Sequence, residues 1–275
     1  MHRNICSGLV GLLLFLFSAS ASGQELFVYT EPASNMPAQS VGLRLNNWLM
    51  QETDGGRLNY HLLPEVMWGV NKNLMLHAEA FLSNRKDGSG LAFEGGSAYG
   101  KYRFFTRDAL HRHFRMAAYG RVSINNADIH QDEIMINGHN SGYEGGLILT
   151  QLLHKQAISL TVGYVHATDN AGGNEIPNGK ARDGINYALS TGRLILPKKY
   201  TGYGQTNFNI MLEVLGQVLP QTGKQYLDIA PSVQFIFNSQ TRVDIGYRTP
   251  LFTNMERTAP SGFLFRLEHL LFNVF

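Results

Sequence analysis

The pattern of hydrophobic and polar positions along most of the chain repeats every two residues, which is typical of β-strands and not of helices. In the segment 58–70, Leu62 and Val66 belong to an apolar face, and Asn59 and Glu65 lie on the opposite, polar face. We count about twelve segments of this kind, most of them roughly 10–15 residues long. Strands of globular proteins average about 5–6 residues, whereas a tilted strand needs about 9–11 residues to cross a bilayer. The pattern therefore predicts about twelve strands of membrane-spanning length.

Glycines interrupt the alternation in three of these segments. The segments are 90–105, 138–152 and 183–196, and the interruptions are Gly95-Gly96, Gly145-Gly146 and Gly192. Because glycine inside a strand often marks a bulge or a bend, we expect bulges or bends at these positions.

The connections between the segments alternate in length. Short turns are expected at 71–73, 154–155 and 238–240, and longer polar links at 51–57, 127–137, 168–182 and 254–261. Bacterial outer-membrane barrels have short periplasmic turns, long external loops and an even number of strands. Both chain ends are therefore expected in the periplasm. The link 197–204 is long for a periplasmic turn and departs from this scheme.

The first 23 residues have the layout of a secretory signal peptide. A positive charge precedes the compact apolar run Leu9–Phe17, and small residues follow it. The run is shorter than the roughly 20 residues of a membrane-spanning helix. Cleavage after Ala21 or after Gly23 fits about equally well, and either removes Cys6, the only cysteine. We therefore expect an exported mature chain without disulfides.

Composition narrows the class of protein further. Charged residues make up 16% of the chain, against about 25% in soluble proteins. The net charge of +2 is not that of a nucleic-acid-binding protein, so no nucleic-acid partner is expected. The sequence contains no phosphate-binding loop, dinucleotide fingerprint or Cys-His zinc pattern, so no cofactor and no metal site is predicted.

The strands of a soluble β-sandwich also alternate between apolar and polar residues. The length of the strands and the residue types on each face therefore decide the fold class. One face of the predicted strands is nearly all apolar with many aromatic residues, while the other carries charges. In lipid, every backbone donor and acceptor must be paired, and strands achieve this only in a closed barrel. We predict an all-β protein in which residues 38–275 form a transmembrane antiparallel up-and-down β-barrel of about twelve strands. We expect it in the bacterial outer membrane, with both termini periplasmic.

The last strand carries the most specific pattern. Phe263, Phe265, Leu267, Leu271 and Phe275 share one face, on which His269 and Asn273 are polar exceptions. This resembles the C-terminal assembly signal of Gram-negative outer-membrane proteins, in which alternating apolar residues end on an aromatic residue. The resemblance implies that the barrel-assembly machinery recognises Phe265, Leu267, Leu271 and Phe275.

Two segments, Leu63–Asn73 and Ala230–Gln240, each combine a proline-containing strand with a tight turn. Together with the closing strand, they loosely resemble the outer-membrane channels grouped with the meta-pathway phenol-degradation family. The resemblance implies passive passage of small molecules, including hydrophobic ones, with no catalytic residue to transfer. The expected partners are outer-membrane lipids, the barrel-assembly machinery and a small-molecule solute.

Charged residues on the polar faces are expected to point into the barrel, because an Arg or Lys at the midplane of the lipid face costs about 2–4 kcal/mol. The predicted lumen-lining residues are Glu65, Glu79, Arg115, Arg121, Glu213, Asp228, Asp244, Arg248, Arg266 and Glu268. These residues either form ion pairs that stabilise the interior or filter the solutes that pass, and the sequence leaves both roles open.

The segment 24–37 precedes the first strand, contains Pro32 and Pro37, and does not alternate cleanly. As a periplasmic amino-terminal segment it either folds into the lumen as a plug or forms a disordered lead. The sequence favours neither interpretation over the other.

An enzyme is the first alternative to a channel. His139 and Ser141 have the His-x-Ser spacing of barrel lipid hydrolases. A serine nucleophile needs a base within hydrogen-bond reach and a third group that orients the base. No orienting residue stands at the matching point of the next strand, and Glu144 lies on the opposite pleat from Ser141. A lipid hydrolase that uses His139 and Ser141 is therefore the weaker hypothesis.

Acidic residues in a predicted outer loop give a second cluster. It consists of Asp128, His130, Asp132 and Glu133. These types can bind a divalent cation, but no recognised ligand spacing is present, so a solvated polar loop is expected. A structural or adhesive barrel whose outer loops bind a partner is the remaining alternative to a channel.

Overall fold

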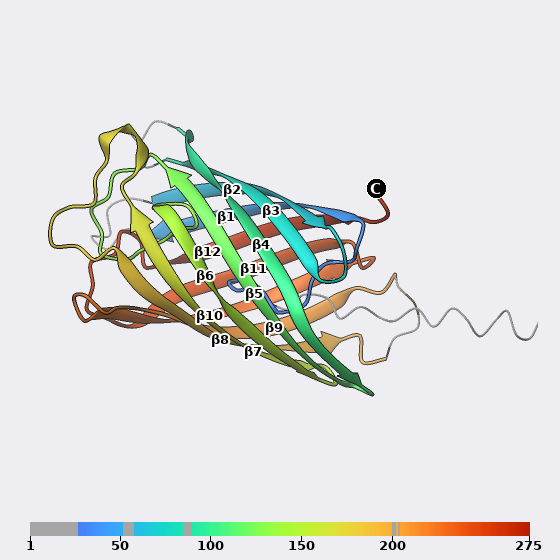
Figure 1. The fold of residues 1–275 in the computed structure, drawn as a ribbon. Helices are drawn as coiled ribbons and strands as arrows, with labels where there is room; N and C mark the ends of the chain where they lie inside the picture. The colour runs from blue at the N-terminus through green and yellow to red at the C-terminus, as the bar shows by residue number, and fades with distance from the viewer. Residues whose placement is uncertain (1–26, 52–57, 85–89, 200–201, 203) are drawn as a thin grey trace, which may run out of the picture.

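Twelve antiparallel strands close into one barrel in the computed structural model, which describes residues 27–51, 58–84, 90–199, 202 and 204–275 (Figure 1). The strands are β1 (Ser40–Gln51), β2 (Leu58–Gly69), β3 (Leu74–Ser83), β4 (Ala92–Ala109), β5 (Arg112–Asn125), β6 (Ser141–Leu153), β7 (Gln156–Thr168), β8 (Asp183–Leu196), β9 (Asn207–Leu219), β10 (Lys224–Phe237), β11 (Thr241–Thr253) and β12 (Ser261–Leu271). Each strand pairs with its neighbours in sequence, and β1 pairs with β12. The predicted all-β, up-and-down barrel of about twelve strands is confirmed. The predicted signal peptide lies outside the described residues.

Apolar side chains cover the outside of the barrel and polar side chains fill its interior, which is the reverse of the arrangement in a soluble protein. Leu189 and Phe263 are 52% and 55% exposed on the outer face, whereas Glu213 and Asp244 are 0% exposed in the interior. Successive residues of a strand point to opposite faces, so the sequence alternation becomes an apolar exterior and a polar interior. An apolar surface that surrounds the barrel suits lipid and not water. Within the described residues, no helix is long and apolar enough to cross a membrane.

The two ends of the barrel differ in their connections. At one end, which we term the turn end, β1 begins, β12 ends, and the connections 70–73, 110–111, 154–155 and 238–240 are short. The opposite end, the loop end, carries the connections 126–140, 169–182 and 254–260. The predicted alternation is confirmed in these connections, and the long link at the turn end spans 197–206. The connection 220–223 is short although it lies at the loop end.

The glycines of the barrel wall have two different roles. Gly95 has a φ of +151°, and the register between β3 and β4 shifts beside it, so the expected bulge is confirmed there. Gly145-Gly146 and Gly192 pair regularly, so the bulges expected at these positions were wrong. Gly163 leaves room for an aromatic ring inside the barrel, because a Cβ there would lie 2.3 Å from the Tyr119 Oη.

Candidate functional site

Residues 27–37, the described part of the amino-terminal segment, lie inside the barrel and are bound by inward-pointing side chains. The carboxylate of Glu213, near the middle of β9, accepts hydrogen bonds from the backbone N–H groups of Val28 and Tyr29, both at 2.8 Å. The same carboxylate accepts hydrogen bonds from the hydroxyls of Thr30 at 2.7 Å and Ser190 at 3.0 Å. Four donors therefore converge on one buried carboxylate, and three of them belong to the segment.

Charged groups hold the next residues of the segment. Glu31 lies 2.9 Å from Arg44 of β1 and 3.3 Å from Lys101 of β4. Lys101 Nζ also donates a hydrogen bond of 2.7 Å to the carbonyl of Pro32. Lys101 is 0% exposed, and its described charge partner and carbonyl acceptor both belong to the segment. A buried ammonium group requires charged or hydrogen-bonding partners, and residues 27–37 supply them for Lys101. The inward face of the barrel wall is therefore complementary to this segment.

The loop 126–140 enters the barrel from the loop end. Gln217 of β9 hydrogen-bonds both the N–H and the C=O of Ile134, at 2.9 and 2.8 Å. Arg121 of β5 donates a hydrogen bond of 2.8 Å to the side chain of Asn137. Apolar residues of the loop pack with other loops and with strands in a cluster of Ile129, Ile134, Ile136, Val165, Ala167, Ile176, Ala181, Leu219, Tyr226 and Met255. The loop end is therefore closed in part by a packed apolar core.

Two carboxylates and two arginines beside this loop form a buried cluster. Glu133 lies 2.8 Å from Arg257 of the connection 254–260 and 3.3 Å from Arg248 of β11. Asp228 of β10 lies 2.7 Å from Arg257 and also forms an ion pair with Arg248. The guanidinium of Arg257 stacks on the ring of Tyr226 at 3.9 Å from its centroid. This four-charge cluster (Glu133, Asp228, Arg248 and Arg257) ties two loop-end connections to the barrel wall.

Asp132 joins further connections at the loop end. Its carboxylate lies 3.3 Å from Lys180, 2.7 Å from Lys224, and accepts a hydrogen bond of 2.8 Å from the backbone N–H of Glu256. Burial alone would raise the pKa of Asp132, but the hydrogen bonds from Lys224 and Glu256 and the charge of Lys180 hold that pKa below its ordinary value. The expected solvated loop was wrong for Asp132 and Glu133, which are buried and ion-paired. The described residues contain no cluster of metal-ligating side chains.

The loop 126–140 is expected to loosen in acid because of Asp132. The pKa of Asp132 is lower in the folded protein than in the unfolded chain. The charge of Asp132 therefore stabilises the folded loop fully above the unfolded-state pKa, and this stabilisation is lost as the pH falls through the folded-state pKa. Hydrogen exchange of the loop amides, compared with strand amides, should therefore rise below about pH 4. An Asp132→Asn variant should show weak protection of the loop already at neutral pH and a smaller further loss in acid. A wild-type loop that stays equally protected in acid would contradict this role.

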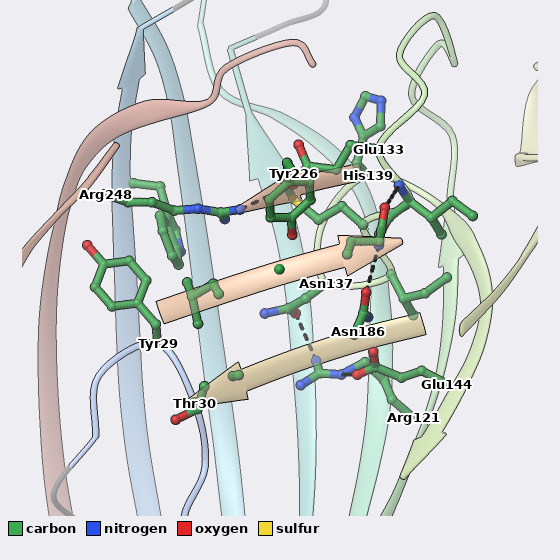
Figure 2. Close-up of a pocket in the computed structure, with 18 of the residues that line it drawn as sticks. Tyr29, Thr30, Arg121, Glu133, Asn137, His139, Glu144, Asn186, Tyr226 and Arg248 are labelled. Carbon is green, nitrogen blue, oxygen red and sulfur yellow. Dashed lines mark hydrogen bonds and ion pairs between the residues drawn. The ribbon is translucent and has the colours of Figure 1, made fainter. Parts of the chain in front are cut away.

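A cavity of about 300 Å³ lies between the two inserted segments (Figure 2). Residues 29–31 border this central chamber on one side, and residues of the loop between 131 and 139 border it on the other. Strands from most of the barrel supply its walls, with Trp48, Tyr99 and Tyr119 among the aromatic residues. Its wall arginines are ion-paired: Arg121 lies 3.0 Å from Glu79 and 3.2 Å from Glu144, and Arg248 lies in the four-charge cluster. The chamber thus combines aromatic surface with charges that already have partners.

The ten charged residues predicted to line the lumen lie on the inward faces of their strands, but only Arg121 and Arg248 of the ten border the central chamber. The others form ion pairs or hydrogen bonds elsewhere in the interior. These contacts are Glu65 with Arg44 and His77, Glu79 with Arg121, Arg115 with Ser34, Glu213 with residues 28–30, Asp228 with Arg248, Asp244 with Arg242 and Arg266, and Glu268 with Arg44 and Arg242. The interior charges are therefore extensively paired.

Sequence reasoning missed Glu31, Lys101 and Arg257, and it named Glu133 only as a member of a solvated acidic loop. Glu31, Glu133 and Arg257 lie in segments without strand alternation, so no periodicity indicates where their side chains point. Lys101 lies in a strand that glycines interrupt. The presence of acidic and basic residues in these segments was an available signal. Buried charges need partners of opposite sign, so such residues could have been considered as partners for the charged residues of the lumen.

Comparison with known proteins supports the fold. No family model and no curated protein matches the sequence. An outer-membrane channel from Pseudomonas putida F1 aligns over 89% of this chain and 99% of its own, with a TM-score of 0.55 and 11% identity. The chain has the fold of an outer-membrane channel. The predicted resemblance to such barrels is confirmed at the level of the fold, which is all that identity of this order shows.

Two other solved structures align less closely. The monoaromatic hydrocarbon channel CymD has a TM-score of 0.44 and 10% identity, over 87% of this chain and 90% of its own. The outer membrane phospholipase A from Escherichia coli has a TM-score of 0.42 and 10% identity, over 86% of this chain and 91% of its own. Alignments this loose carry no argument about activity.

The structure does not arrange His139 and Ser141 as a nucleophile and its base. The Ser141 hydroxyl accepts a hydrogen bond of 2.8 Å from the Asn125 N–H and donates one of 3.2 Å to the Asn125 carbonyl. Ser141 is 5% exposed, so its hydroxyl is not presented to lipid. The ring of His139 packs edge-on against His130 at 6.2 Å. The serine hydroxyl is thus engaged by the backbone of β5, which disfavours the hydrolase hypothesis.

Proposed function

We propose that this protein is an outer-membrane channel through which small molecules pass by diffusion, without a covalent step or a cofactor. The observation that carries the proposal is the central chamber, which lies inside a closed barrel and is walled by strands on its sides. The fold that the chain shares with the Pseudomonas putida channel supports it. A cavity enclosed by a membrane barrel has a path to water only through the barrel ends, so solutes that reach it travel along the barrel axis.

We infer the orientation from the connections. The turn end would face the periplasm with both chain ends, and the loop end would face the outside, as in other bacterial barrels. The apolar outer face would contact outer-membrane lipids. The alternating residues Phe265, Leu267 and Leu271 are exposed on that face, in agreement with a strand that is read by the assembly machinery before the barrel closes.

The chamber is bordered by two barriers that stand in series along the axis. Residues 27–37 would act as a plug on the periplasmic side, held by Glu213, Arg44 and Lys101. The loop 126–140 would act as the external barrier, held by the four-charge cluster and Asp132. Passage of a solute would then require both segments to move. The paired charges would serve mainly to hold these barriers, and less to filter solutes.

Planar-bilayer recording and solute uptake into vesicles test the channel proposal. The purified full-length protein is expected to give brief current steps separated by long closed periods, because both barriers must open together. Uptake should fall steeply for solutes that are larger than the chamber. Vesicles that neither conduct ions nor take up small solutes, with either the wild-type protein or a variant that lacks both barriers, would contradict the proposal and favour a structural or adhesive barrel.

A further inference from the structure

Three arginines interrupt the apolar outer face of β4–β8 in the last two rows of residues before the turn end. The strand pairings place these residues in rows across the sheet. The first row is Phe105, Met116, Leu149, Leu160 and Leu189. The next row is Arg107, Phe114, Gln151, Ile158 and Thr191, and the last is Ala109, Arg112, Leu153, Gln156 and Arg193. Three arginines therefore stand on the lipid-facing side where the apolar band ends.

These three arginines form no ion pair with the described residues of the protein. Arg107, Arg112 and Arg193 are exposed, and within the described part of the chain none of them has an ion-pair partner. The acid nearest to them in sequence, Asp108, lies on the inward side and pairs with His113 at 2.8 Å. The two glutamines of the rows hydrogen-bond within the sheet and leave the arginines unpaired.

The described residues of the opposite rim differ in their charge partners. On the same flank at the loop end, Arg182 lies 2.8 Å from Asp169, and His166 lies 2.7 Å from Asp183. Arg182 at that rim has an acidic partner, whereas Arg107, Arg112 and Arg193 at the turn end have none within the described residues. Lys198 and Lys199 in the nearby connection 197–206 are also exposed and add to the positive charge. Among the described residues of β4–β8 and their connections, the arginines without an acidic partner on the outer face therefore lie at the turn end.

We propose that Arg107, Arg112 and Arg193 bind the phosphate groups of anionic phospholipids in the leaflet at the turn end. The inference rests on the membrane placement given under the proposed function. Phosphates lie at the depth where the apolar band of a barrel ends, and a guanidinium matches a phosphate in charge and in hydrogen-bond geometry. Phe105 and Phe114, in contact at 6.0 Å between ring centroids, mark that depth as an aromatic interface would.

The position of the arginines favours lipid over an acidic protein. Their side chains share the face of Phe105, Phe114 and Leu160, which continues into the lipid-facing band. The strands β4 and β5 also extend beyond β3, whose pairing with β4 stops at Tyr102, so this flank reaches further toward the leaflet surface (Figure 1). A basic group on the outside of the wall, and not at the mouth of the lumen, meets headgroups before it meets a protein in the periplasm.

The experiment measures which lipid surrounds the barrel. Full-length protein is reconstituted in phosphatidylcholine vesicles that contain a trace of spin-labelled phosphatidylglycerol or phosphatidylethanolamine, and the immobilised fraction of each label is recorded. The wild type is expected to prefer phosphatidylglycerol by roughly twofold averaged over the lipid shell, and salt should weaken the preference. The variant R107Q/R112Q/R193Q should lose the preference, and R107K/R112K/R193K should keep most of it. R182Q at the opposite rim is the matched control and should behave as the wild type.

Three outcomes would overturn the inference. The first is an unchanged preference in the glutamine variant, and the second is an equal loss in R182Q. The third is a wild-type protein that shows no preference for phosphatidylglycerol, or a preference that salt does not weaken. This third outcome can be measured even if the glutamine variant does not fold. An acidic peptide that binds the wild type, but not the glutamine variant, while the lipid preference is unchanged would assign the rim to a protein partner instead. Ion conductance should be the same in all these variants, because the three arginines lie outside the lumen.

Discussion

Weakening of both barriers together is expected to raise the conductance of the barrel in planar bilayers far more than weakening of either one. The two variants to combine are a deletion of residues 27–36 and Arg257→Ala, which removes one of the two arginines that pair with Glu133 and so loosens the loop 126–140. The barriers border the central chamber on different sides, so their resistances add in series. When one is removed, the other still limits the current. Single-channel recording of the wild type, the two single variants and the combined variant measures this dependence.

The comparison between the variants identifies which barrier fails if the prediction is wrong. A deletion that conducts as well as the combined variant would mean that Arg257 does not hold the loop as a barrier. An Arg257→Ala variant that conducts as well as the combined variant would mean that residues 27–36 do not plug the lumen. Glu213→Gln is a milder test of the plug, because it keeps the shape of the side chain while it weakens three hydrogen bonds to the segment. It should conduct at a level between the wild type and the deletion.

Replacement of Arg257 by alanine is also expected to cause the largest loss of stability among single substitutions in the site. Glu133 and Asp228 are 5% and 0% exposed, and without Arg257 both would share the single charge of Arg248. Breaking a buried ion pair by removal of one partner typically costs about 3–5 kcal/mol. The contact of the guanidinium with the ring of Tyr226 would be lost as well. The free energy of unfolding in urea and the hydrogen exchange of residues 126–140 measure the effect.

Two variants define what the Arg257 result means. Arg182→Ala removes a partner of Asp169 in an exposed pair, with side-chain exposures of 41% and 45%, and is expected to cost about 0–1 kcal/mol. Arg257→Lys keeps the charge but not the forked donor geometry, so its loss should lie between those of the other two variants. If Arg257→Ala loses no more than Arg182→Ala, the four-charge cluster does not hold the loop.

The strand pattern was predictable from the sequence because each strand of a membrane barrel has one face in lipid. A buried soluble strand can be apolar on both faces, but here alternation such as Ile158, Leu160 and Val162 with Ser159 and Thr161 appears in most of the strands. The same physical rule sent the charged residues inward, and Glu213 and Asp228 lie where alternation placed them. The bulge expected at a glycine was confirmed at Gly95 only. A glycine in a strand can permit an unusual backbone conformation, as at Gly95, or leave room for a neighbouring ring, as at Gly163, and the sequence does not distinguish the two.

The site depended on contacts that no local pattern records. Residues 27–37 and 126–140 have no periodicity, and the groups that bind them, such as Glu213 and Gln217, lie far away in sequence. Asp132 and Glu133 looked like a solvated acidic loop because their partners, Lys224 and Arg257 among them, come from other connections. A charge is stabilised by whatever surrounds it in space, and sequence neighbours do not reveal that environment.

The sequence by itself determined that this chain forms a closed barrel of twelve strands with an apolar exterior, since alternation over long strands has no other stable solution in lipid. It also determined which strand residues face inward, because side chains alternate strictly along a strand. Only the tertiary structure decided that two inserted segments enclose a chamber and that Arg121 and Arg248 border it. Those features follow from long-range pairing of buried charges and hydrogen bonds, whose partners come together only when the barrel closes.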